Sequence, residues 1–264
     1  MVSFSKYREL PPLLDSHIHL THDTDGMYPD HFHYFTNSAS PDGWSSILAI
    51  DNNQVFSFLG IHPECGSGPI DDIGWEVHLK ELEGFAKSQP IGIGECGIDN
   101  RYYQSFTKFE QHQLLQQQLR LAERYSLPIT LHHVHAAEMI ISSLKNERLT
   151  TRFMLHGFYG SKQTAKRILD LGGFLSISPN LLRSKEKFSQ LVSYIPNDRL
   201  LVETDYPYTY IPAEWEDYSY AEVLYTWYET IAKARVIDIH ALLDIVQSNG
   251  KILTNTPLDR RSII

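Results

Sequence analysis

The chain has 264 residues, is 42% hydrophobic, and carries a formal net charge of −9 because 32 acidic residues outnumber 23 lysines and arginines. This balance argues against a protein that coats nucleic acid with an extended basic face, although bound metal ions could supply positive charge locally. The two cysteines are too few for a disulfide framework, no apolar run has transmembrane length, and we expect a single cytoplasmic domain over residues 1–264 without an obligate protein partner.

Four segments in the N-terminal part of the chain are predicted strands, namely residues 13–19, 46–51, 55–63 and 91–98. The stretch 21–44 is polar and aromatic and shows no helical period, so we expect a long functional loop there. Only residues 52–54 separate the second and third predicted strands, and such a short connection cannot contain the helix that a parallel crossover needs. This is the least regular part of the expected topology.

Strands and helices alternate regularly from residue 75 onward. The predicted helices cover residues 75–88, 107–125, 136–145, 162–171, 185–194, 220–234 and 238–252. The predicted strands cover residues 129–132, 153–158, 174–178 and 200–204. Eight strands alternating with helices predict an α/β fold, a single TIM-type (β/α)8 barrel whose chemistry lies at the carboxyl ends of its strands.

Polar side chains follow the apolar part of most predicted strands. They are His17, His19, Asp51, His62, Glu95, His132, His156, Ser178 and Asp205. Glu95 interrupts a run of isoleucine and glycine, and a carboxylate buried in such a run needs a cation to neutralise it. His17 and His19 are two apart on a strand and therefore face the same side, although two buried structural histidines are the alternative interpretation.

Four of these histidines and two of the carboxylates form a donor set for divalent cations. We expect metal ligands at His17, His19, Glu95, His132, His156 and Asp205. Imidazole and carboxylate together suit two ions such as Zn²⁺, Mg²⁺ or Mn²⁺, and one carboxylate, Glu95, can bridge them. Two cations with a bridging hydroxide between them favour hydrolysis, with Glu95 and Asp205 as catalytic residues and Asp205 as proton acceptor.

Three further residues have predicted supporting roles. Glu203 is the third predicted catalytic residue: it lies one strand period before Asp205, on the same face, and would support the site from behind. His62 is a candidate substrate contact, with a structural histidine as the alternative. Arg101 is a candidate phosphate contact, with a solvent-exposed arginine as the alternative.

Roles other than metal binding are predicted for several further side chains. The pair His31 and His33 lies in the predicted loop, where we favour a solvated or substrate-facing role over metal binding. Cys96 should point away from Glu95 into the core. Tyr208 belongs to a group of tyrosines after Asp205 that could stack on a ring or base.

Several motifs in chain order resemble those of the TatD family of metal-dependent deoxyribonucleases. They are Asp15–His19, Gly60–Pro63, Gly94–Asp99, Leu131–His132, His156–Phe158 and Val202–Pro207. The resemblance covers nearly the whole chain and implies a barrel of the metal-dependent hydrolase superfamily. It also implies one metal ion among His17, His19, Glu95 and Asp205, and a second among Glu95, His132 and His156.

The resemblance implies hydrolysis of DNA phosphodiester bonds, often as a 3'-to-5' exonuclease, with single strands or 3' ends of DNA as the partner. Val134 and His135 stand where the family usually carries an arginine and then an acidic residue, so the usual substrate contact is missing. One alternative is the same binuclear site acting on a non-nucleic-acid ester, lactone or amide. Another is a metal-binding scaffold without turnover.

Overall fold

The computed structural model describes residues 12–20, 28–67 and 74–255, in which eight parallel strands pair in the order β1 to β8. The strands are β1 Leu14–Ile18, β2 His33–Asn37, β3 Val55–Leu59, β4 Gly92–Asp99, β5 Ile129–Val134, β6 Phe153–Leu155, β7 Phe174–Ile177 and β8 Leu200–Val202. β8 lies next to β1, and just after the end of β8 the amide of Asp205 donates to the carbonyl of His17 at 2.9 Å. The predicted (β/α)8 barrel is confirmed.

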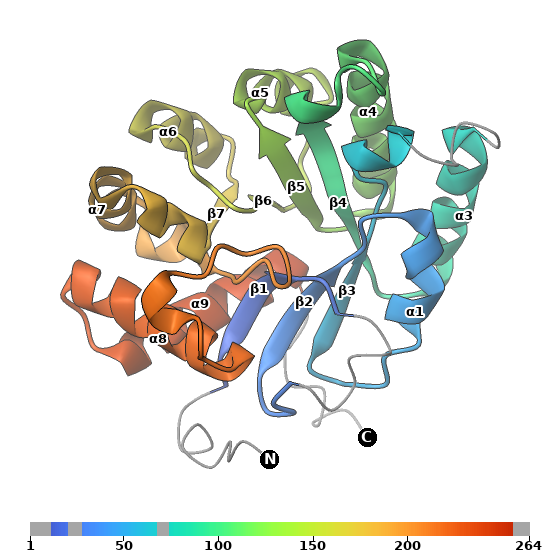
Figure 1. The fold of residues 1–264 in the computed structure, drawn as a ribbon. Coiled ribbons are helices and arrows are strands. Elements are labelled where there is room, and N and C mark those ends of the chain that lie inside the picture. Colours follow the sequence, from blue (N-terminus) through green and yellow to red (C-terminus); the bar gives the residue numbers. More distant parts are fainter. Residues whose placement is uncertain (1–11, 21–27, 68–73, 256–264) are drawn as a thin grey trace.

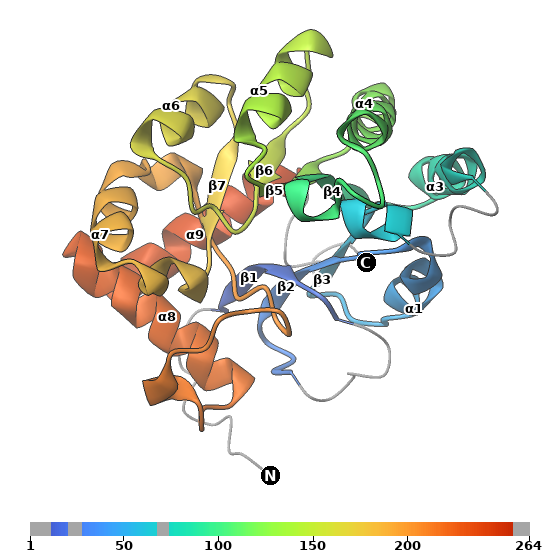
Figure 2. The same ribbon diagram turned by 45° about the horizontal axis from the view of Figure 1, so that its top comes forward.

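The helices lie outside the strands, as Figures 1 and 2 show for α3 to α8. The α-helices are α1 Trp44–Leu48, α3 Trp75–Ser88, α4 Lys108–Tyr125, α5 Ala137–Asn146, α6 Lys162–Asp170, α7 Lys185–Tyr194, α8 Tyr220–Arg235 and α9 Ile239–Thr254. The short 3-10 helices are η3 Pro41–Gly43, η4 Pro63–Ser67, η5 Asn100–Tyr102, η6 Pro179–Arg183, η7 Asn197–Arg199 and η8 Ala213–Trp215. Among the described residues, no helix combines the length and apolar character needed to cross a bilayer.

The second strand was predicted in the wrong place. Residues 46–51 were expected to form it, but α1 occupies Trp44–Leu48 and the strand is β2, inside the stretch 21–44 that was expected to be a loop. All five residues of β2 are buried, and its Thr36 pairs inside the protein: the amide of Leu20 donates to Thr36 Oγ1 at 3.0 Å. A strand buried on both faces shows no alternation, and a short apolar run is compatible with either a helix or a strand. Residues 21–27 of the predicted loop lie outside the described part.

Two polar residues lie away from the carboxyl ends of the strands. His33 begins β2, pairs in register with Leu14 at the start of β1, and is 6% exposed, so the expected solvated or substrate-facing role is wrong. Asp51 is exposed and precedes β3, so it lies toward the amino end of that strand. Cys96 is fully buried in the hydrophobic core, as predicted.

Gly97 lets β4 approach β5 closely. A Cβ atom added at Gly97 would lie 2.0 Å from the carbonyl oxygen of His132, which is backbone and cannot rotate away. We expect Gly97→Ala to lower the free energy of unfolding by about 3 kcal/mol in a denaturant titration. Gly84→Ala is the control, since Gly84 lies exposed within α3 with nothing near the added atom. It should raise the free energy of unfolding by about 0.5 kcal/mol, and equal effects of the two variants would contradict the packing argument.

Candidate metal centre

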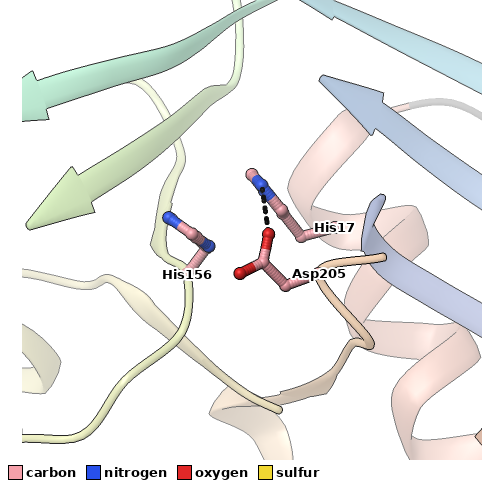
Figure 3. Close-up of side chains that lie close together, drawn as sticks. All are labelled: His17, His156 and Asp205. Atoms are coloured by element: carbon pink, nitrogen blue, oxygen red, sulfur yellow. Dashed lines mark ion pairs between the residues drawn. The ribbon is translucent and has the colours of Figure 1, made fainter. Parts of the chain in front are cut away.

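Side chains from five strand ends meet at the carboxyl end of the barrel. They are His17 on β1 and His19 just after it, Glu95 on β4, His132 on β5, His156 directly after β6, and Asp205 after β8. Figure 3 shows His17, His156 and Asp205 pointing toward one another from three separate segments. The ring centroids of His17 and His156 are 3.9 Å apart. The structure therefore brings together all six side chains that were predicted as metal ligands.

Glu95 lies between two pairs of histidines. Its Oε2 atom is 3.4 Å from His17 Nε2 and 3.5 Å from His19 Nε2. Its Oε1 atom is 2.6 Å from His132 Nδ1 and 2.8 Å from His156 Nε2. The side chain is 5% exposed, so each oxygen of a buried carboxylate faces a different pair of imidazoles.

The two imidazoles in each pair also face each other. His17 Nε2 and His19 Nε2 are 3.3 Å apart, and His132 Nδ1 and His156 Nε2 are 3.1 Å apart. Ligand atoms of His17, His19 and Glu95 lie within 4.8 Å of one another, as do those of Glu95, His132 and His156. Nitrogen and carboxylate oxygen atoms that converge in this way form donor groups able to hold metal ions.

Asp205 has ion pairs with the first histidine pair, and its ligand atoms also lie within 4.8 Å of those of His17 and His156. Its Oδ1 atom is 3.5 Å from His19 Nε2 and 3.7 Å from His17 Nε2. Its backbone has φ +62°, a left-handed conformation that aspartate tolerates better than most residues. Burial alone would raise the pKa of the Asp205 carboxyl, but the hydrogen bond with His19 and the nearby imidazoles lower it. Asp205 is therefore ionised at neutral pH and available as a ligand or proton acceptor.

Three of the four outward ring nitrogens lie next to other groups, while His17 Nδ1 has no hydrogen-bond partner among the described residues. His132 Nε2 is 3.1 Å from Asp99 Oδ2, and His19 Nδ1 is 2.9 Å from the carbonyl oxygen of Asn37. His156 Nδ1 is 3.5 Å from Glu203 Oε1. Such outer contacts fix the tautomer and orientation of histidines that bind metal. They leave one nitrogen of each ring directed at the centre.

Glu203 lies behind the centre. The carboxylate is fully buried and accepts a hydrogen bond from the amide of Gly157 at 2.6 Å. It reaches His156 but not Glu95 or Asp205 in any ion pair or hydrogen bond of the described residues. It can therefore orient His156, and it does not lie among the converging donor atoms.

Asp99 is a candidate functional residue that was not predicted from the sequence. Its carboxylate contacts His132 and also accepts from Arg101 Nε at 2.9 Å. Burial opposes ionisation, yet the hydrogen bonds from His132 and Arg101 hold the pKa of Asp99 well below its usual range. The available signal was spacing, because Asp99 lies four residues after Glu95 on one strand and so shares its face.

Asp99→Asn should weaken metal binding without unfolding the protein. The amide keeps the shape of the carboxylate but removes the charge that orients His132 and raises its basicity. We expect the dissociation constant of the metal to rise between about 10-fold and 100-fold, measured by competition with a chromophoric chelator. Asp198→Asn, at an exposed position in η7, is the control. Unchanged metal affinity in Asp99→Asn would show that the contact with His132 is only structural.

His62 and Arg101 line a cavity of about 460 Å³ together with five of the six converging side chains, all except the fully buried His17. His62 Nε2 is 3.7 Å from Glu95 Oε1, and His62 Nδ1 accepts a hydrogen bond from the amide of Glu64 at 3.1 Å. Burial lowers the pKa of His62 to about 3, so the ring is neutral and its proton is on Nε2, toward the cavity. The Arg101 side chain is 58% exposed and held by Asp99 at the cavity wall.

The match to known proteins extends over most of the chain. The family model described as TatD related DNase matches residues 14–255. The chain belongs to this family. A metal-dependent hydrolase of Buchnera aphidicola is 32% identical over 213 residues, which cover 77% of this chain and 78% of the relative. The human deoxyribonuclease TATDN3 is 34% identical over 164 residues, 59% of each chain.

Solved structures support the TatD fold independently of sequence. The crystal structure of the TatD homologue YjjV from Escherichia coli superimposes with a TM-score of 0.78 at 23% identity, covering 93% of this chain and 98% of YjjV. As a member of the TatD family, the chain is a metal-dependent hydrolase. Its own converging histidines and carboxylates are able to bind metal.

Proposed function

We propose that this TatD-family chain hydrolyses phosphodiester bonds of DNA, using two divalent cations held on either side of Glu95. The observation that carries the proposal is the placement of one Glu95 oxygen against each histidine pair. A single carboxylate shared between two donor groups can bridge a pair of cations. The name of the human relative, a deoxyribonuclease, supports DNA as the substrate.

The donor chemistry fits such ions. His17, His19, Glu95 and Asp205 would hold one cation. Glu95, His132 and His156 would hold the other. Imidazoles suit Zn²⁺ and Mn²⁺ better than Mg²⁺, which prefers oxygen ligands, so we expect Zn²⁺ or Mn²⁺. The bound cations would neutralise charge on the phosphoryl oxygens and supply a water-derived nucleophile at neutral pH.

The remaining residues of the cavity have defined tasks in this proposal. Asp205 accepts the proton of the attacking water, because it is ionised and partly exposed to the cavity. The neutral His62 ring donates a hydrogen bond from Nε2–H to a phosphoryl oxygen, and Arg101 places a positive charge at the cavity wall. Tyr208, 70% exposed with its ring 5.1 Å from that of His19, can stack on a terminal base.

The alternative substrate is a non-nucleic-acid ester, lactone or amide. The observation that favours it is Val134, an apolar residue that lines the cavity where the family usually carries an arginine able to contact a phosphate. The same donor groups would serve for such a bond, since cations can polarise a carbonyl oxygen as well as a phosphoryl oxygen. Both classes of substrate are therefore compared with the same metal-loaded protein.

The test uses protein purified without chelator, with its metal content measured. Apoprotein is reloaded with Zn²⁺, Mn²⁺ or Mg²⁺ and incubated with single-stranded oligonucleotides labelled at either end. Mononucleotide release from 3' ends supports a 3'-to-5' exonuclease, and release from 5' ends contradicts that polarity. Metal-loaded protein that releases no nucleotide under any of these metals, yet cleaves an ester, lactone or amide in parallel assays, would overturn the nuclease proposal.

A further inference from the structure

A second cavity, larger than the first, lies beside the candidate metal centre. It has a volume of about 990 Å³ and is lined in part by Lys108, His133, Tyr159, Asn180, Arg183 and Lys187. We propose that this cavity, the cationic groove, binds the phosphates and bases of single-stranded DNA next to the bond that is cleaved. The inference rests on the proposed function and assigns the substrate contacts that hold the strand.

The groove is continuous with the metal cavity. His133, Val134, Gly157 and Asn180 line both of them. A nucleic acid strand whose scissile phosphate lies near Glu95 can therefore pass directly into the groove. Its size suits one or two nucleotides of a single strand, since cavities of this order hold drug-sized ligands.

The charge of the groove is opposite to that of the whole chain. Lys108, Arg183 and Lys187 line it, and among the described residues none of these cations forms an ion pair with a carboxylate. The one carboxylate in the lining, Glu138, is bound by Arg167. On a chain with a net charge of −9, such unneutralised cations beside the centre favour a polyanion.

Aromatic rings hold two of these cations in place. The guanidinium of Arg183 lies 4.4 Å from the centre of the Tyr210 ring. Lys187 Nζ lies 3.9 Å from the centre of the Tyr159 ring and donates to the carbonyl oxygen of Tyr159 at 3.1 Å. A stacked guanidinium keeps the N–H groups at its edge free for phosphate oxygens. Positive charge combined with aromatic side chains is typical of grooves that bind single strands.

His133 adds an unsatisfied polar group at the junction of the two cavities. Both of its ring nitrogens are buried and have no hydrogen-bond partner among the described residues. A buried polar group without a partner is costly, and a ligand that supplies one regains that free energy. A phosphate or sugar oxygen of a strand crossing from the metal cavity into the groove would be such a partner.

The test compares Arg183→Ala/Lys187→Ala with Lys145→Ala/Lys251→Ala, a control that removes the same charge from exposed positions on α5 and α9. Fluorescence anisotropy measures binding of a labelled single-stranded 12-mer to the full chain in the presence of chelator, which prevents cleavage. We expect the groove variant to bind about 10-fold more weakly, and its salt slope to fall by about 1.4, because each lost phosphate contact contributes about 0.7 for single strands. The control should match the unmodified chain.

Kinetics of the metal-loaded protein distinguish a role of the groove in strand binding from a role in the hydrolysis step. Bis(4-nitrophenyl) phosphate reaches the metal cavity but is too short to extend along the groove. The groove variant should show about a 10-fold higher KM for the 12-mer and unchanged kinetics with the small diester. If the groove variant has the same affinity, salt slope and KM as the control variant, the proposed role of the groove is wrong. If the unmodified chain cleaves neither substrate, the proposed function fails, and the anisotropy result still decides whether the groove binds the strand.

Discussion

Under the proposed function, Glu95→Gln is expected to remove both metal ions and to lower phosphodiesterase activity at least about 10³-fold. The physical reason is that, among the ion pairs of the described residues, only those of Glu95 reach both histidine pairs, with one carboxylate oxygen on each. An amide keeps the size of the side chain but offers one oxygen and no charge, so it cannot serve two cations. Metal content per chain and kcat with a single-stranded oligonucleotide are the two measurements.

Glu64→Gln is the matched control for this experiment. Glu64 lines the same cavity, but its carboxylate is 60% exposed and its nearest approach to the histidines is 3.9 Å, to His62. We expect it to retain both ions and to change kcat by less than about 3-fold, as an exposed charge is worth little. A Glu95→Gln protein that keeps two ions per chain would refute the bridging role.

Asp205→Asn should remove only one of the two ions and lower kcat between about 10²-fold and 10⁴-fold. Asp205 contacts His17 and His19 but has no ion pair with His132 or His156 among the described residues. The donor group of Glu95, His132 and His156 is therefore left intact. We expect kcat to fall because the substitution removes both a metal ligand and the proposed proton acceptor. Metal analysis and single-turnover kinetics with the remaining ion bound measure the two effects.

Asp217→Asn supplies the comparison at an exposed position between η8 and α8. It should retain both ions and full activity. If Asp205→Asn lost both ions, the two donor groups would be one cooperative unit and the assignment of Asp205 to a single ion would be wrong. Unchanged kcat would exclude it as the proton acceptor.

The error in β2 has a definite physical origin. The sequence His33–Asn37 mixes polar and aromatic residues, and the hydroxyl of Thr36 bonds to the distant backbone of Leu20, accepting from its amide and donating to its carbonyl. Those partners exist only once the barrel has formed. The run 46–51 contains Ile47 and Leu48, and its short length allowed a strand or a helix. The first residues of this run belong to the helix α1, which lies between β2 and β3 and supplies the helical connection that the predicted topology lacked.

Local pattern by itself determined the barrel and the residue types at its strand ends. The alternation of buried apolar runs with amphipathic helices can be recognised from neighbouring residues. A glutamate within such an apolar run can be recognised in the same way, because a buried carboxylate needs a partner. Only the tertiary structure decided which oxygen of Glu95 meets which histidine pair, that Asp99 holds His132, and that Arg183 and Lys187 lie beside the centre. Distances between side chains that are far apart in sequence depend on the register and tilt of all eight strands together. No local segment contains that information.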